Sequence, residues 1–237
     1  MMTQIALGKI AVDVVKKDIK NLHLSVYPPS GRVRISAPLR MDLDRIRIFA
    51  ISKLPWIRQQ QKKVVDQERE SPREYLERES HYVWGKLYLL KIREVDHAAP
   101  KVEVTPSKLL LQIRPGTSVE RREEILDEWY RVQLRQAAPA IIHKWEPLLG
   151  VKVDRIFVQR MKTKWGSCSR TSPSIRLNTD LAKKPAECLE YVIVHEMAHL
   201  LEPTHNKAFV ALMDYCLPKW RHRKDQLNNL PLRHETW

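Results

Sequence analysis

Residues 191–205 read YVIVHEMAHLLEPTH, and both the fold and the chemistry of the chain are best worked out from this stretch. A helix built from it carries apolar side chains on nearly every side, which predicts that it is buried. Residues four apart share one helix face, so His195 and His199 present two imidazoles side by side. Buried imidazoles need partners, and a metal ion supplies them. The alternative is a pair of core histidines that hydrogen bonds satisfy.

Glu196 completes the pattern HExxH in this stretch. It lies about 100° around the helix from His195, so it cannot share a row with the two imidazoles. It can instead reach a water molecule on the open side of a bound metal ion, where a general base is needed. The sequence therefore predicts two metal ligands and one base on a single helix.

His205 is the expected third ligand. Five residues separate it from His199, which is the spacing of the last two histidines in HExxHxxGxxH. Glu202 stands where that pattern has glycine, and Pro203 is expected to end the helix instead. A catalytic zinc has three protein ligands and an open position. We therefore expect one Zn²⁺ on the three histidines, with Glu202 and Asp214 as fallback ligands.

The first 117 residues are predicted to be rich in β-structure. Short alternating or β-branched runs indicate strands at residues 10–15, 22–26, 32–36, 83–92, 101–104 and 108–113. The sequence YPPSG at residues 27–31 indicates a turn and hence a hairpin. Asp42 is expected to cap a helix that Pro55 kinks or divides. The polar residues 66–80 suggest a surface helix or a connector.

From Ser118 onward the pattern is mainly helical. Ser118 is a good N-cap for one long helix that ends near Gly150. Further strands are expected at residues 152–160 and 174–177, and further helices from Pro185, from about residue 205 and near residue 219. Thr204 is expected to cap the helix that starts near residue 205. The chain is thus predicted to be an α+β protein, with a β-rich domain at residues 1–117 and a second domain at residues 118–237.

The composition is typical of a soluble globular protein. The 237 residues carry a net charge of +14, which is compatible with binding nucleic acid, a nucleotide or another polyanion but does not require it. The sequence shows no apolar run of eighteen residues and no secretory signal, so we expect no membrane segment. Three widely spaced cysteines indicate reduced thiols and a cytoplasmic location.

Four motifs together resemble the YgjP-like (SprT-like) zinc metallopeptidases. The motifs are RMKTKWGSCS at residues 160–169, SIRLN at 174–178, YVIVHEMAHLLEPTHNKAF at 191–209 and LPKWRHRKDQLN at 217–228. The resemblance implies a zincin-like metallopeptidase domain in the C-terminal part, with His195, His199 and His205 as ligands and Glu196 as base. One departure lies at Ala208-Phe209-Val210, where the family often has Phe-Trp, and we expect this position to serve packing.

The resemblance also implies that KTKWGSCS lines the substrate cleft. Lys164, Trp165 and Ser167 are the substrate-binding candidates in this segment, and Asn178 is a candidate for shaping the substrate edge. An extended peptide often pairs with such an edge strand in zincins.

These observations predict a zinc-dependent hydrolase that cleaves peptide bonds in a peptide or protein substrate. Glu196 would take a proton from the attacking water, and the candidates for stabilising the oxyanion are Lys164, Tyr215 and His222. One rival is hydrolysis of a nucleotide phosphoanhydride, which has been described for members of this family, although no phosphate-cradling glycine-rich loop is visible. A second rival is a nucleic-acid-binding module with a structural zinc, a site that normally has four ligands. The occurrence of family members beside type I restriction systems suggests a DNA-linked partner.

Overall fold

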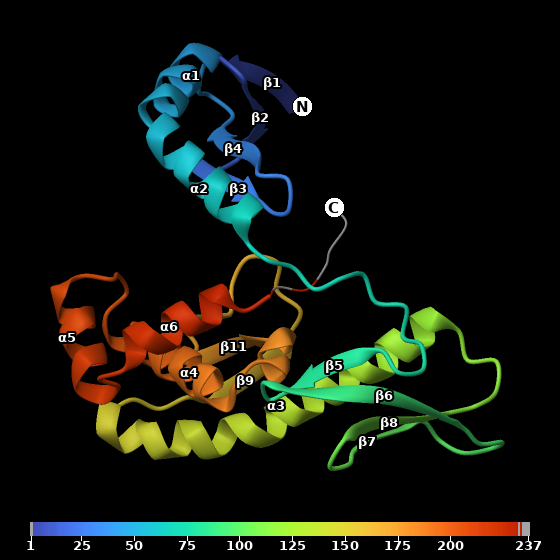
Figure 1. Ribbon diagram of the computed structural model, residues 1–237. Helices are drawn as coiled ribbons and strands as arrows, with labels where there is room; N and C mark the ends of the chain where they lie inside the picture. Colours follow the sequence, from blue (N-terminus) through green and yellow to red (C-terminus); the bar gives the residue numbers. More distant parts are fainter. Residues whose placement is uncertain (1, 232, 234–237) are drawn as a thin grey trace. The chain divides into compact units, whose positions relative to one another are not determined.

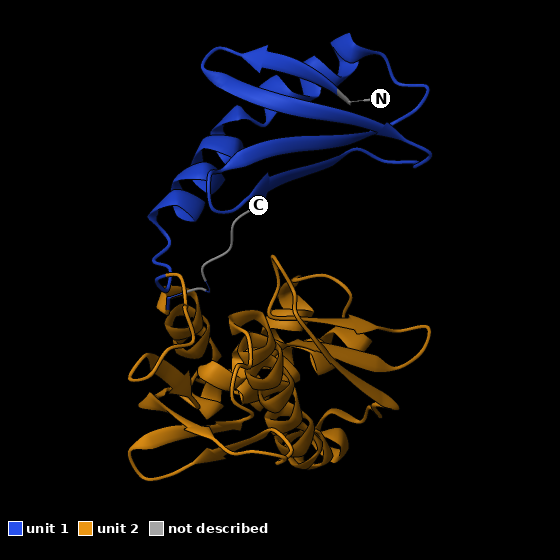
Figure 2. Ribbon diagram, turned by 90° about the vertical axis from the view of Figure 1, so that its right-hand side faces the viewer, with its two compact units in different colours: residues 1–71, 231–237 blue, residues 72–230 orange. Residues whose placement is uncertain are grey.

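The computed structural model describes residues 2–231 and residue 233, which form two compact units (Figures 1 and 2). Unit 1 holds the residues up to Ser71 together with the described C-terminal residues, and unit 2 holds Pro72–Leu230. Unit 1 contains β1 (Met2–Leu7), β2 (Ile10–Lys17), β3 (His23–Tyr27), β4 (Arg32–Pro38), α1 (Leu43–Ser52) and α2 (Leu54–Asp66). The first half of unit 2 contains β5 (Ser80–Val83), β6 (Lys86–Glu94), β7 (Lys101–Val104), β8 (Lys108–Ile113) and α3 (Val119–Leu149). The second half contains β9 (Arg155–Gln159), β10 (Gly166–Ser169), β11 (Ser174–Asn178), the 3₁₀-helix η1 (Thr179–Lys183), α4 (Ala186–Leu201), α5 (Lys207–Cys216) and α6 (Trp220–Asn229).

Unit 1 is a four-stranded sheet in the order β1-β2-β4-β3, with α1 and α2 packed on it. The expected hairpin is present, because β3 and β4 pair antiparallel and Gly31 adopts a φ of 73° between them. Asp42 caps α1 as predicted, since its side chain accepts a hydrogen bond of 2.7 Å from the Arg45 N–H. Pro55 opens a second helix, α2, because its ring suits the first turn of a helix. The strand β1 was not expected from the sequence.

The first sheet of unit 2 has the order β5-β6-β8-β7 and packs on α3 (Figure 1). α3 begins at the predicted cap, where the Ser118 side chain accepts from the Arg121 N–H, and ends at Gly150 in the left-handed conformation. The run expected as one strand at residues 83–92 is divided by a turn at Trp84 and Gly85, both of which have positive φ. The Tyr130 hydroxyl on α3 donates to the Tyr82 carbonyl at 2.9 Å, which joins helix and sheet.

The boundary between the units lies after Ser71, whereas the sequence suggested a division at residue 117. The sheet of β5–β8 belongs with α3, because its inner face and the helix bury their apolar side chains in one core. Leu90, Leu109 and Leu111 contribute to that core from the sheet, and Tyr130 and Leu134 contribute from α3. A sheet with one apolar face needs such a cover. The polar residues 66–80 contain the true connector between the units.

The second sheet of unit 2 is small and positions the helix that carries HExxH. Its order is β10-β11-β9, with β11 parallel to β9 and antiparallel to β10, and α4 packs against β10 and β11. The strand β10 lies inside KTKWGSCS, where the sequence predicted no strand. α4 ends at Leu201, just before Pro203, as expected, whereas α5 is capped by Asn206 rather than by Thr204. The described residues include no helix whose length and apolar character would let it cross a membrane.

Candidate active site

Three histidine nitrogens converge where α4 meets the turn before α5. The Nε2 atom of His205 lies 3.1 Å from Nε2 of His199 and 3.2 Å from Nε2 of His195. A tetrahedral zinc ion with Zn–N distances of about 2.0–2.1 Å holds its nitrogens about 3.3 Å apart. In the described part of the chain, these are the residues whose grouping could hold a metal ion. The three imidazoles therefore fit a zinc ion in number, atom and spacing.

The protonation of the histidines also suits a metal ion. The Nδ1 atom of His199 lies 2.9 Å from the Glu202 carbonyl, which fixes this nitrogen as the donor and leaves Nε2 with a free lone pair. Burial, followed by the influence of His199 and His205, lowers the pKa of His195 to about 3. Burial also lowers the pKa of His205. The lowered pKa values of His195 and His205 favour the neutral form of these imidazoles, which is the form that binds a metal ion.

Phe209 on α5 packs against all three imidazoles. Its ring stacks on His199 at a centroid distance of 4.5 Å and meets His195 and His205 edge to face at 5.1 and 4.8 Å. The side chain is 1% exposed. A buried ring in contact with every ligand limits how far each imidazole can rotate. The packing role expected for Phe209 thus lies directly at the metal site.

Glu196 is buried beside the triad, on the same helix. Its residue is 7% exposed, and this burial raises the pKa of the carboxyl group to about 7, although the nearby charge of Lys164 acts in the opposite direction. A general base works best when its pKa lies near the working pH. The burial and the raised pKa of Glu196 suit a general base, and this role stays a prediction.

Gly166, the first residue of β10, lets the sheet approach Glu196 closely. A Cβ atom at this position would lie 2.9 Å from both Cγ and Oε1 of Glu196 and 2.8 Å from Cγ1 of Val192. These distances are shorter than ordinary contacts between non-bonded atoms. The backbone of β10 therefore forms one wall of the space that holds the carboxylate. The sequence contains this glycine within KTKWGSCS, but only the tertiary structure shows that it lies close to Glu196.

Asn178 organises the segment before β10 from the end of β11. Its Nδ2 group donates to the carbonyls of Met161 and Lys164 at 2.8 and 2.9 Å, and its backbone N–H donates to the Trp165 carbonyl at 2.9 Å. The residue is 5% exposed. Any influence of Asn178 on a substrate therefore runs through the backbone of this segment.

Comparison with known proteins gives the family. Residues 20–230 match the model of the YgjP-like metallopeptidase domain. The chain belongs to the YgjP-like family. It is therefore placed among metal-dependent hydrolases of the metallopeptidase class. The expected α+β fold is confirmed, whereas the zincin-like character of the C-terminal part stays a prediction. No curated protein gives a significant match.

Two solved metallopeptidase zymogens are similar to part of the chain. Abylysin from Pyrococcus abyssi is 19% identical, with a TM-score of 0.35 over 38% of this chain and 90% of its own. Jannalysin from Methanocaldococcus jannaschii is 21% identical, with a TM-score of 0.34 over 38% of this chain and 91% of its own. Both overlaps are partial, so the family assignment rests on the sequence match.

A cavity of about 360 Å³ opens over the metal site of this YgjP-like chain. Its lining includes two of the predicted substrate-binding residues, Lys164 and Trp165, but neither Ser167 nor Asn178. The full lining is Lys164, Trp165, Gly166, Tyr191, Val192, His195, Glu196, His199, His205, Lys224, Leu227 and Asn228. Lys224 and Asn228, from α6, were missed in the sequence. The motif LPKWRHRKDQLN contains both, but its spacing alone does not show which face of α6 meets the cleft.

The other residues considered from the sequence lie outside this cavity. Tyr215 is 79% exposed on α5, and neither it nor His222 lines the cavity. Asp214 accepts a hydrogen bond of 2.7 Å from Trp220 Nε1 and forms an ion pair with Arg221. Neither fallback ligand, Glu202 or Asp214, joins the histidine group.

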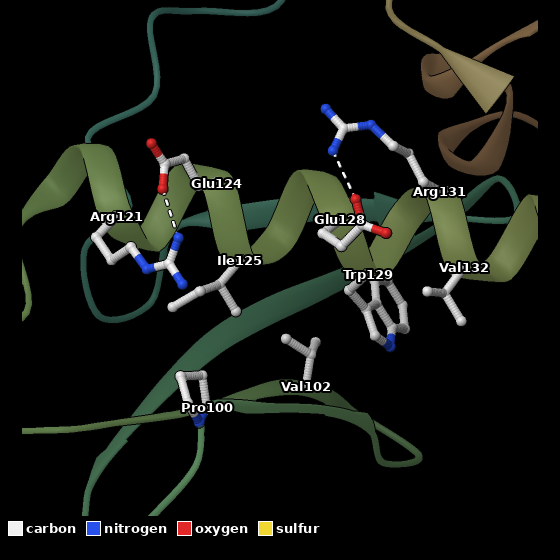
Figure 3. A pocket seen from close by; sticks show the side chains of 9 residues that line it. All are labelled: Pro100, Val102, Arg121, Glu124, Ile125, Glu128, Trp129, Arg131 and Val132. Atoms are coloured by element: carbon white, nitrogen blue, oxygen red, sulfur yellow. Dashed lines mark hydrogen bonds and ion pairs between the residues drawn. The ribbon is translucent and has the colours of Figure 1, made fainter.

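A larger hollow of about 640 Å³ lies between α3 and β7 (Figure 3). Its four charged side chains belong to ion pairs on α3, Arg121 with Glu124 at 2.6 Å and Arg131 with Glu128 at 2.7 Å. Size alone would favour this hollow as the functional site. The smaller cavity holds the three converging histidines and the buried carboxylate, so it is the candidate active site.

Proposed function

We propose that this chain is a zinc-dependent metallopeptidase that uses Glu196 as its general base. The observation that carries the proposal is the convergence of three imidazole nitrogens beside a buried carboxylate on one helix. Family membership supports the hydrolase class, and the His195–Glu196–His199 spacing on α4 supports the mechanism.

Zinc is the proposed metal because of the donor set. Three neutral imidazoles form a site that suits zinc among the common biological cations, whereas magnesium and calcium prefer oxygen ligands. The three protein ligands leave a position open, which is typical of catalytic rather than structural zinc sites. The count expected is one ion per chain. Four protein ligands found by metal spectroscopy would favour the alternative of a structural zinc module.

The residues of the chain divide the hydrolytic work among them. A bound zinc ion would supply Lewis acidity, which lowers the pKa of a water molecule and polarises the substrate carbonyl. Glu196 accepts a proton from the attacking water and passes it to the amide nitrogen as the C–N bond breaks. Gly166 lets the backbone of β10 lie close to the carboxylate of Glu196, which limits the space in which the carboxylate can move. Lys164 is the remaining oxyanion candidate that lines the cavity.

The decisive experiment compares Glu196→Gln with Glu187→Gln. Both changes remove one carboxylate from α4, but Glu187 is exposed and lies in the first turn of the helix. We expect both variants to hold one zinc ion per chain, and only Glu196→Gln to lose peptide hydrolysis, by about 100- to 10,000-fold in kcat. Full hydrolysis by Glu196→Gln would refute the assignment of the base.

Substrate class needs its own measurement. Unfolded proteins, peptide libraries and nucleoside triphosphates are offered to the same purified enzyme. Peptide cleavage is the expected result, and release of pyrophosphate or phosphate without peptide cleavage would favour the phosphoanhydride alternative. A nucleic-acid partner and the cytoplasmic location stay predictions, and the three free cysteines are compatible with that compartment.

A further inference from the structure

The charges that line the active-site cavity are unbalanced. Apart from the metal-binding histidines, its charged lining residues are Lys164, Lys224 and Glu196. The single carboxylate is the proposed base, and it is buried on α4. Two ammonium groups, from the segment before β10 and from α6, thus face a cavity in which a divalent cation would add further positive charge.

Neighbouring basic residues on α6 are neutralised, which makes Lys224 distinctive. Arg221 pairs with Asp214, and Arg223 lies 2.7 Å from a carboxylate oxygen of Glu190. Within residues 2–231 and 233, no ion pair involves Lys224. The Nζ atom of Lys224 lies 5.8 Å from the centroid of the Trp220 ring. An aromatic ring attracts a cation but does not neutralise its charge. The basic residue of α6 that reaches the cavity is therefore an unpaired one.

Lys164, in the segment before β10, also lacks an ion-pair partner among the described residues. Its backbone carbonyl is held by Asn178, but its ammonium group has no ion-pair partner in the described part of the chain. In the larger hollow beside α3, by contrast, every charged lining residue is in an ion pair. The active-site cavity thus differs in this respect from the larger hollow beside α3.

Both lysines share a cavity with the proposed reacting groups. Lys164 and Lys224 line the same cavity as Glu196 and the three histidines. An anionic group that binds these lysines would therefore lie beside the reacting bond. Asn228, one turn after Lys224 on α6, adds an amide donor to the same wall.

We infer that the cleft selects peptides with a carboxylate beside the scissile bond, bound by Lys224 with help from Lys164 and Asn228. This inference rests on the proposed peptidase function and names its substrate class. The carboxylate of an Asp or Glu side chain supplies the charge that the cavity lacks. The apolar lining from Trp165 and Leu227 accommodates the rest of a side chain.

The test uses matched peptides. A capped peptide that the wild type cleaves is made in pairs that differ only by Glu or Gln, scanned through the positions on either side of the cleavage site. We expect Glu at one position to raise kcat/KM about tenfold over Gln, as a charge-assisted hydrogen bond would. Lys224→Met should bring that ratio close to one, and Lys164→Met should reduce it. Lys219→Met is the matched control, because Lys219 caps the same helix without lining the cavity.

A binding measurement separates this inference from the proposed function. Fluorescence anisotropy of the same labelled peptides on Glu196→Gln should show a tenfold tighter Kd for the Glu peptide, and high salt should reduce the difference. Equal cleavage of Glu and Gln peptides, or a preference that survives Lys224→Met, would overturn the carboxylate site and leave the peptidase intact. Charge-selective binding without any peptide cleavage would instead refute the peptidase and keep the carboxylate site.

Discussion

Gly166→Ala should lower kcat/KM because it adds one methyl group against Glu196. The added Cβ would lie 2.9 Å from Cγ and Oε1 of Glu196 and 2.8 Å from Cγ1 of Val192. Non-bonded carbon atoms prefer separations of about 3.5–4.0 Å, so the neighbours must withdraw by roughly 0.6 Å or more. Gly166 does not have a positive φ, so alanine adds steric pressure without backbone strain.

The expected losses of stability and activity depend on which residues the added methyl group contacts. Val192 and Glu196 are both buried on α4, so the change overpacks a dense region at a cost of about 1–3 kcal/mol in the free energy of unfolding. Misplacement of a catalytic group by about 1 Å can cost about 100-fold in rate. We therefore expect kcat/KM to fall about 10- to 100-fold. Metal content should stay at one ion per chain, because none of the atoms nearest to the new methyl group belongs to a histidine.

The assay combines three measurements on purified protein. Peptide hydrolysis gives kcat/KM, elemental analysis gives the metal content, and urea denaturation gives the free energy of unfolding. Ser169→Ala serves as the control, since it lies at the other end of β10 and removes an atom rather than adding one. A folded, metal-loaded Gly166→Ala variant with wild-type kcat/KM would show that Glu196 is not the base or is not held against β10.

Three further changes probe the metal site and its support. His205→Ala should leave the circular dichroism spectrum unchanged, because His205 is exposed, and should lower the zinc content measured after dialysis well below one ion per chain. Phe209→Leu should weaken zinc affinity about tenfold in a chelator competition, and an unchanged affinity would refute its role in holding the three imidazoles. Glu190 on α4 is partly buried, which raises its pKa, but hydrogen bonds from Lys144, Arg223 and Trp145 outweigh this and hold the pKa below 4.5. Its stabilisation is therefore present above pH 4.5 and lost as the pH falls through the lowered pKa, so Glu190→Gln should cost about 2 kcal/mol in urea denaturation at pH 7 and progressively less in acid.

The sequence predicted well those features that depend only on residues within one helix. Ser118 and Gly150 mark the ends of α3 because N-capping and the left-handed C-terminal residue are local chemistry. The ligand spacing of His195 and His199 is likewise local, since it depends only on the helical repeat. The strand β10 was missed because Gly, Ser and Cys carry no clear alternation, and its pairing with β11 supplies what its propensity lacks.

The boundary between the two units could not be predicted from the sequence pattern. Composition changes at residue 117, where strands give way to a helix, but compact units are defined by which apolar faces share a core. The sheet of β5–β8 buries its inner face against α3, so the chain divides after Ser71. A pattern of side chains shows that a face is apolar, and it does not show which other face will cover it.

The sequence by itself determined the candidate site, which consists of two proposed ligands and a proposed base on one helix and a proposed third ligand after Pro203. It also determined a family resemblance that the family match confirms. These are properties of spacing along a single turn or loop. Only the tertiary structure decided that Phe209 braces the imidazoles, that Gly166 admits the carboxylate, and that Lys224 reaches the cleft. These contacts join segments far apart in the chain, and their partners are chosen by the packing of α4, α5, α6 and β10, which short-range propensities do not encode.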